Sequence, residues 1–200
     1  MKEFRIIVLG DFGVGKEEIF KRYTKNKFDE DNLSTIGLSF ANKELTLKNK
    51  EKISLKLIDT GGQEKYKAIT KSYYKNADGV LFVFAHNDKE SFDYIIECIK
   101  LFEENCINKE IPKFLIGNKN DLKKFDEQES FDDFIKEHNI LRYISTSAKD
   151  NINIKEIFRD MAEIINQTTN KKTTQTKVEK KLKKKKPGRC QQCYGPDNMN

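Results

Sequence analysis

The sequence predicts an α/β domain built on a mostly parallel sheet and followed by a basic tail. Short apolar runs alternate with stretches whose apolar residues recur at helical spacing. Charge is also unevenly distributed: residues 170–200 hold ten basic and two acidic residues, whereas residues 1–169 hold 28 basic and 30 acidic ones. We therefore expect a nearly neutral domain over residues 1–169 and a flexible polybasic tail over residues 170–200.

The expected elements follow in order along the chain. The run FRIIVL (residues 4–9) predicts a buried strand that ends at Gly10, and a helix follows over about residues 15–25. Residues 38–47 and 53–58, separated by KNKEK, predict a hairpin. The remaining expected elements are strands at 79–85, 112–118 and 141–145 and helices at 89–105, 127–138 and 154–166.

Composition and charge exclude several classes of protein. The N-terminal segment lacks the apolar region of a secretory signal, and the longest apolar run (80–85) is too short to span a bilayer. A nearly neutral body argues against nucleic-acid binding by the domain. The four cysteines suggest no disulfide framework, so we expect a reducing compartment, and a lone C-x-x-C pair (Cys190, Cys193) offers two ligands where zinc needs about four.

The segment GDFGVGKE (residues 10–17) resembles a phosphate-binding loop with one residue changed. The motif is G-x-x-x-x-G-K followed by Ser or Thr, and Glu17 stands in the hydroxyl position. Backbone N–H groups of Gly13, Val14, Gly15, Lys16 and Glu17 would cradle phosphate oxygens, and the Lys16 side chain would reach the β- and γ-phosphates. A glycine-rich strand–helix turn that binds no ligand is the alternative for this loop taken alone.

Three further short motifs stand at the ends of expected strands. DTGG (59–62) fits D-x-x-G, so Asp59 would hold Mg²⁺ through water and the Gly62 N–H would contact a γ-phosphate. NKND (118–121) fits N-K-x-D, and the Asp121 carboxylate can accept hydrogen bonds from two guanine N–H groups. TSAK (146–149) would present the Ala148 N–H to the guanine oxygen. The predicted base-binding residues are Asn118, Lys119, Asp121, Ser147, Ala148 and Lys149.

Together these motifs resemble those of small GTPases of the Ras superfamily over about residues 3–168, and most closely those of Rab proteins. The stretches that carry the Rab resemblance are STIGLSF (34–40), LIDTGGQEKY (57–66) and AITKSYYKNADGVLFVF (68–84). The resemblance implies a P-loop small GTPase domain with a six-stranded sheet and about five flanking helices. It also implies that Thr35 binds Mg²⁺ and the γ-phosphate, that Phe28 packs on the guanine ring, and that Gln63 orients the attacking water.

A Rab-like protein is expected to switch between GTP and GDP, to hydrolyse GTP and to regulate vesicle traffic. The resemblance implies a monomer on the cytosolic face of endomembranes, whose switch regions meet effectors, an exchange factor and a GTPase-activating protein. The basic tail would meet an anionic membrane surface. The alternative is a nucleotide-dependent binding module with little or no turnover.

Three departures from the Rab pattern bear on these expectations. Glu17 replaces the Mg²⁺-binding hydroxyl and should weaken the metal site. Phe12 occupies a P-loop position that is usually small, which predicts slow hydrolysis. Cys190 and Cys193 follow a polybasic run as lipidated cysteines do in Rab proteins, yet seven residues follow Cys193. Lipidation and a solvated basic tail both remain open from the sequence.

Overall fold

The computed structural model describes residues 1–29, 39–59, 72–123, 125 and 131–183, with the backbone alone for residues 172–183. Its described residues form one six-stranded sheet in the order β2-β3-β1-β4-β5-β6. The strands are β1 (Lys2–Leu9), β2 (Ser39–Thr46), β3 (Lys52–Asp59), β4 (Gly79–Ala85), β5 (Lys113–Asn118) and β6 (Arg142–Ser145). The β2–β3 hairpin is antiparallel and every other pair is parallel, which confirms the expected sheet.

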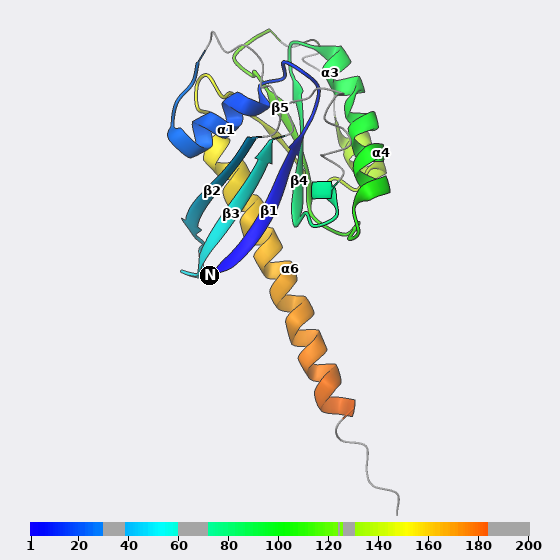
Figure 1. The fold of residues 1–200 in the computed structure, drawn as a ribbon. Helices are drawn as coiled ribbons and strands as arrows, with labels where there is room; N and C mark the ends of the chain where they lie inside the picture. The colour runs from blue at the N-terminus through cyan, green and yellow to red at the C-terminus, as the bar shows by residue number, and fades with distance from the viewer. Residues whose placement is uncertain (30–38, 60–71, 124, 126–130, 184–200) are drawn as a thin grey trace, which may run out of the picture. The chain divides into compact units, whose positions relative to one another are not determined.

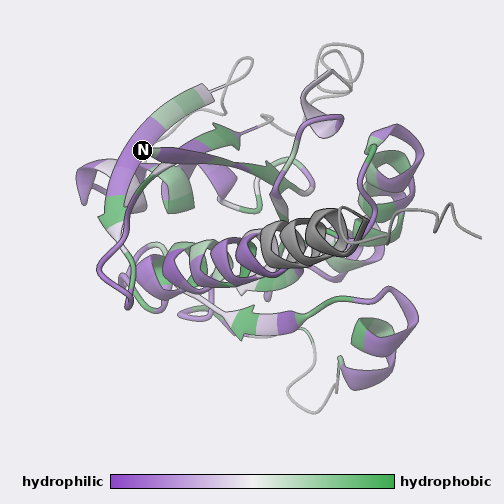
Figure 2. Cartoon of the chain, turned by 90° about the horizontal axis from the view of Figure 1, so that it is seen from below, coloured by the Kyte–Doolittle hydropathy of each residue, from purple (hydrophilic) through white to green (hydrophobic). Residues whose placement is uncertain are grey.

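Helices cover both faces of the sheet (Figure 1). In the described part of the chain they are α1 (Lys16–Lys25), α3 (Lys89–Asp93), α4 (Ile95–Asn105), α5 (Asp132–Glu137) and α6 (Ile154–Lys183). Buried residues of α1 and of the first turns of α6 form one core with one face of the sheet. Those of α3 and α4 form a second core on the other face, where α5 also packs. Hydrophobic and hydrophilic stretches accordingly lie side by side along the helices (Figure 2).

Two expected helices have different bounds in the structure. The helix expected over 89–105 is divided into α3 and α4 at Tyr94, which serves as the C-cap of the first and the N-cap of the second. The Asp88 side chain begins α3 by accepting a hydrogen bond from the Ser91 N–H. The helix expected over 127–138 is shorter, because α5 begins at Asp132, and residues 126–130 lie outside the described part.

The last helix is longer than the sequence predicts. We expected helix over 154–166 and a tail without regular structure from about residue 168, but α6 continues to Lys183. Residues 167–186 contain neither glycine nor proline, and nine of these twenty residues are lysine, which is a good helix former. The predicted helix end at residue 166 was therefore wrong, and residues 184–200 lie outside the described part.

The chain divides into two compact units, Met1–Asn166 and Gln167–Asn200. The first unit contains the whole sheet. No helix among the described residues is long and apolar enough to cross a membrane.

Strand order places the functional loops on one edge of the sheet. β1 pairs with β3 on one side and with β4 on the other, so the chain crosses β1 between these two strands. Such a crossing creates a switch point, where ligands bind beyond the carboxyl ends of the strands. Because β1, β3, β5 and β6 run parallel, their carboxyl ends all lie at this edge.

Candidate functional site

The loop after β1 has the backbone of a phosphate-binding loop. Gly15 adopts a left-handed conformation (φ 89°) and precedes the first turn of α1, so the N–H groups of that turn are directed into the loop. Gly10 lies against β4 so closely that a Cβ there would be 2.0 Å from the Val83 carbonyl oxygen. Both positions therefore require glycine, for backbone conformation at Gly15 and for space at Gly10.

Lys16 lies folded over this loop. Its side chain is buried, and Nζ donates to the carbonyl oxygens of Gly10 at 3.0 Å and Asp11 at 2.5 Å. Burial lowers the pKa of Lys16 from the ordinary lysine value, and the negative charge of Asp59 partly opposes that effect. The ammonium group is thus held at the loop by carbonyl groups, which cannot neutralise its charge as a phosphate would.

Asp59 stands at the carboxyl end of β3, next to the phosphate-binding loop. It is fully buried and pairs in register with Val8 of β1, one residue before the strand ends. The described residues contain no cluster of three or more His, Cys, Asp or Glu side chains that could hold a metal. A single buried carboxylate still suits Mg²⁺, which is generally held by one or two protein oxygens together with substrate phosphates and water.

Asn118 joins the phosphate side of the site to the base side. Its Nδ2 donates to the Val14 carbonyl oxygen at 2.9 Å, across the sheet from the end of β5. Its Oδ1 accepts from the Ala148 N–H at 3.2 Å and from the Thr146 hydroxyl at 3.3 Å. A Cβ at Gly15 would be 2.5 Å from Nδ2, so the glycine also leaves room for this side chain.

The base-binding residues meet where the loops after β5 and β6 come together. The Ser147 hydroxyl donates to Oδ1 of Asp121 at 2.5 Å and accepts from the Asp150 N–H at 3.0 Å. Asp121 itself is exposed, while Ala148 is buried. Lys119 has a positive φ of 60° and belongs to the turn between these groups. This arrangement positions a carboxylate to face solvent while a neighbouring hydroxyl fixes one of its oxygens.

Arg22 is a residue of this site that the sequence did not indicate. From α1, its Nε donates to the Ala148 carbonyl oxygen at 2.8 Å and its Nη2 to the Lys149 carbonyl oxygen at 2.9 Å. The guanidinium carbon also lies 5.6 Å from the centroid of the Phe28 ring, within range of a cation–π contact. Arg22 thereby links the TSAK loop to the predicted base-stacking aromatic. A basic residue in the last turn of a helix gives no sequence signal for such contacts.

A second residue that the sequence did not indicate, His86, supports β6 next to the site. His86 is buried, and its Nε2 lies 3.0 Å from both the Ser145 and Tyr143 hydroxyl oxygens. Its backbone N–H donates to the Asn118 carbonyl oxygen at 2.8 Å. The ring lies against Gly117, where a Cβ would be 2.5 Å from Nε2. The imidazole therefore holds β6 beside β5 one residue before the TSAK loop begins.

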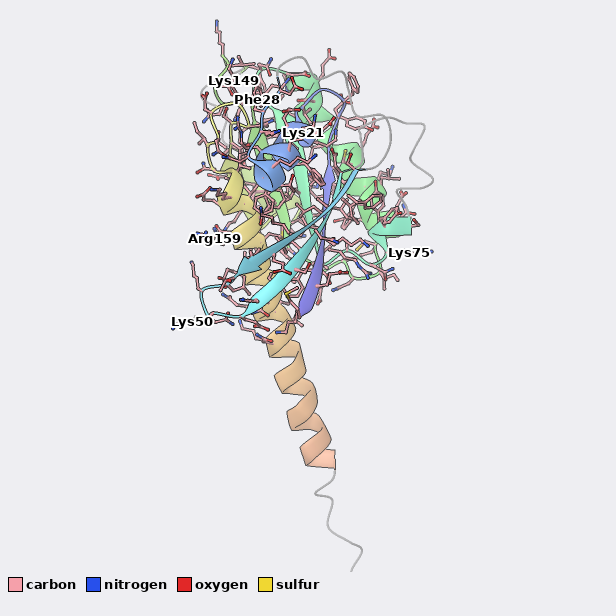
Figure 3. The ribbon with its side chains drawn as sticks, turned by 60° about the vertical axis from the view of Figure 1, so that its left-hand side comes forward. Lys21, Phe28, Lys50, Lys75, Lys149 and Arg159 are labelled. Carbon is pink, nitrogen blue, oxygen red and sulfur yellow. The ribbon has the colours of Figure 1, made fainter. Side chains whose placement is uncertain are left out.

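Glu17 forms an ion pair along α1. Its Oε1 lies 2.9 Å from Nζ of Lys21, one turn along α1, and Lys21 also lies 3.5 Å from Glu18. Burial alone would lower the pKa of Lys21, but its contacts with the two glutamates outweigh that effect and raise it. The other oxygen of Glu18 accepts from the Asp29 N–H at 3.0 Å. Figure 3 labels Lys21 and Phe28 at the end of the domain away from Lys50.

Of the remaining predicted site residues, the structure describes two and leaves five outside its described part. Phe12 is half exposed on the phosphate-binding loop, and Phe28 is half buried. The predicted roles of Thr35, Gly62, Gln63, Cys190 and Cys193 concern residues outside the described part of the chain.

The six-stranded sheet, the phosphate-binding loop after β1 and the loops after β5 and β6 together define a small GTPase domain. Comparison with known proteins agrees, because residues 5–167 match the Ras family. The Ras-related protein Rab-11B of Dictyostelium discoideum is 41% identical over 174 residues, which cover 86% of this chain and 78% of that protein. The GTP-binding protein ypt3 of Schizosaccharomyces pombe is 39% identical over 158 residues (78% and 72%), and Rab-13 of Bos taurus is 36% identical over 161 residues (80% and 78%). The chain therefore belongs to the Ras family, within which it is Rab-like.

Replacing Arg22 with alanine should speed GDP release about fivefold, since the TSAK loop loses two charge-assisted hydrogen bonds and Phe28 loses its neighbour. Arg22→Lys should restore little, because an ammonium group cannot reproduce the fork that reaches both carbonyl groups. Release of a fluorescent GDP analogue measures the rate. Arg142→Ala, which removes an exposed arginine paired with Asp160, is the matched control. Equal rates for the Arg22 and Arg142 variants would contradict this role.

Proposed function

We propose that this protein binds GTP and GDP, hydrolyses GTP and acts as a molecular switch in vesicle traffic. The observation that carries the proposal is the Asn118 side chain, which fastens the phosphate-binding loop to the loops that hold Asp121 and Ala148. A nucleotide needs these two loops close together, because one loop would bind its phosphates and the other its base. Its Rab-named relatives support the assignment to vesicle traffic.

Each group in the site has a role in nucleotide binding. The N–H groups of residues 13–17 would cradle phosphate oxygens, and Lys16 would exchange its carbonyl partners for β- and γ-phosphate oxygens. Asp121 would accept from two guanine N–H groups. The Ala148 N–H, which donates to Oδ1 of Asn118 in the structure, would turn to the guanine oxygen when the base binds. Asp59 and Thr35 would hold Mg²⁺, which would neutralise phosphate charge.

The switch itself belongs to residues that the nucleotide would order. A γ-phosphate would draw Thr35 and Gly62 inward, and its loss on hydrolysis would release them. Gln63 would orient the attacking water. Effectors, an exchange factor and a GTPase-activating protein would recognise these regions. The alternative of a binding module without turnover has no relative or contact that favours it over the switch.

The nucleotide that copurifies with the protein tests this function. Denaturation of the purified chain followed by chromatography should release GDP or GTP, and prior treatment with EDTA should lower the amount. Release of an adenine nucleotide, or of no nucleotide after loading with either GDP or GTP, would contradict the proposal.

Intrinsic hydrolysis should be slow, because Phe12 would crowd the space in which Gln63, the γ-phosphate and an incoming arginine must meet. Phe12→Gly should raise the single-turnover rate about threefold or more. Phe12→Leu keeps much of the bulk and should give a smaller increase. A rate that falls or stays constant in the glycine variant would refute the crowding argument.

We also propose that the tail attaches the protein to the cytosolic face of endomembranes. Each Lys or Arg near an anionic surface contributes about 1 kcal/mol, and stable anchoring generally also needs a lipid. A Cys190→Ser/Cys193→Ser double variant should therefore lose membrane localisation in cells. Retention of that localisation would show that the basic residues suffice without lipidation.

A further inference from the structure

A hollow of about 430 Å³ lies on the domain surface away from the P-loop, between the end of α1, the strand β2 and the first turns of α6. Five of its lining residues are cationic. Arg22 donates to the Ala148 and Lys149 carbonyl groups, and the other four are Lys25 from α1, Lys43 from β2, and Lys155 and Arg159 from α6. We call it the basic hollow. Arg159 projects from the α6 side of the domain, opposite to Lys75 (Figure 3). Segments that are far apart in sequence thus bring like charges together.

Among the residues that the structure describes, little offsets these four charges. Glu44 is the one acidic residue in the described lining, and strand alternation directs its side chain to the other face of β2. Residues 39, 41, 43 and 45 are half buried, whereas 40, 42, 44 and 46 are exposed, and Ala41 and Leu45 pack on the α1–α6 core. Among the described residues, no carboxylate forms an ion pair with any of the four cations.

The other groups at the basic hollow are also suited to an anion. The Tyr23 ring stacks on Phe158 with centroids 4.1 Å apart. Burial raises the pKa of Tyr23 to about 12, against the opposing effect of Arg159, so the hydroxyl remains a neutral donor. Lys43 reaches across to the Thr24 carbonyl oxygen at 3.4 Å, which places its ammonium group between β2 and α1.

Size and charge together select the class of ligand. A concave site lined by charges of one sign concentrates its electric field and attracts small ions of the opposite sign. The volume falls within the range of about 300–1,000 Å³ typical of small-molecule sites. Arginine and lysine together favour phosphate groups, which accept several hydrogen bonds at once. The nearly neutral domain as a whole does not suit a nucleic acid.

We propose that the basic hollow binds a small anion that carries several phosphate groups, either free in solution or as the headgroup of a phosphorylated lipid. This site is separate from the nucleotide pocket. Arg22 also lines the basic hollow, but its guanidinium already holds the Ala148 and Lys149 carbonyl groups. Lys25, Lys43, Lys155 and Arg159 would therefore contact the phosphates.

Titration of the full-length, GDP-loaded protein with inositol trisphosphate tests the site. Bound GDP occupies the P-loop, so amide chemical shifts should change at Tyr23 and Thr24 and not at residues 10–16. A Lys155→Gln/Arg159→Gln variant should weaken binding about tenfold or more. A Lys75→Gln/Lys100→Gln variant loses the same charge from exposed positions elsewhere and should bind as the parent does. Equal weakening in both variants, or no change at Tyr23 and Thr24, would overturn the proposal.

Vesicles identify the source of the phosphates. Vesicles of phosphatidylcholine with a phosphatidylinositol phosphate are compared with phosphatidylserine vesicles of equal surface charge, and the polybasic tail is present in every variant. A lipid ligand predicts a preference for the phosphoinositide that only the variant of the basic hollow loses. A soluble ligand predicts binding of inositol trisphosphate without that preference. GDP release rates check that the variants are folded. Lys25→Gln, at an exposed position, provides a second test, and it should also weaken binding of inositol trisphosphate.

Discussion

Replacing Asp121 with asparagine should lower GDP affinity about 100-fold and make xanthosine diphosphate the preferred ligand. The carboxylate offers two acceptors to the two N–H groups on the guanine edge, whereas an asparagine amide offers one acceptor and one donor. Xanthine carries an oxygen in place of the guanine amino group and so matches the amide. A polar contact with the base that changes from two matched hydrogen bonds to a mismatch changes affinity by this order.

The structure supplies a control for the Asp121 experiment. Ser147 donates to Oδ1 of Asp121, and asparagine can accept the same hydrogen bond through its own Oδ1, so the loop should keep its shape. Asp150→Asn makes the same chemical change at an exposed residue of the neighbouring loop and should leave both affinities unchanged. Competition between GDP and xanthosine diphosphate for a fluorescent nucleotide gives the ratio. An unchanged GDP affinity in Asp121→Asn would refute the assignment of NKND to the base.

Replacing Glu17 with serine should tighten GDP binding about tenfold in Mg²⁺ and make release more sensitive to EDTA. Serine supplies the neutral oxygen that the metal position lacks. The carboxylate now pairs with Lys21, and an i,i+4 pair of this kind contributes only about 0.3–0.5 kcal/mol. A carboxylate about 4 Å from a phosphate would be repelled by roughly 4 kcal/mol at an effective dielectric of 20, so the carboxylate should stay with Lys21 when nucleotide binds. The expected gain of the variant therefore comes from the Mg²⁺ ligand that serine adds, and the lost pair with Lys21 offsets only a small part of it.

A double-mutant cycle shows whether Lys21 keeps Glu17 away from the phosphates. Lys21→Ala alone should weaken GDP binding, because the released carboxylate can turn toward the nucleotide. In the Glu17→Ser background the same substitution should have little effect. Glu18→Ser, one residue along, also removes a contact with Lys21 but should bring no gain in EDTA sensitivity. If Glu17→Ser changes neither GDP affinity nor EDTA sensitivity, the glutamate already performs the role of the hydroxyl group.

The sequence predicts the sheet well and the helix ends poorly. Strand 79–85 has the predicted bounds because its residues are apolar throughout and turn residues flank it. The break at Tyr94 was not predictable from periodicity, since apolar residues on both sides of it keep the same helical spacing. The extension of α6 to Lys183 depends on helix propensity without an apolar pattern, and a polar stretch without such a pattern is also typical of disorder.

For the site, the sequence predicts the residues that belong to short motifs. It misses the residues outside those motifs whose contacts depend on the three-dimensional fold. Asn118 stands within NKND, yet its hydrogen bonds to Val14 and Ala148 depend on the three-dimensional meeting of two loops. Arg22 and His86 contact the site through groups whose positions only the fold determines. The contact between Glu17 and Lys21 has a helical i,i+4 spacing and could have been predicted from the sequence.

The triple contact of Asn118 has a consequence for local unfolding. One side chain hydrogen-bonds to the loop after β1 and to two residues of the segment after β6, so none of these segments can open without breaking a bond to the end of β5. Protein segments that share their hydrogen bonds open together as one cooperative unit. The Val14, Thr146 and Ala148 regions would then open together even without a nucleotide. An empty pocket of this kind would reload without having to rebuild its loops one by one.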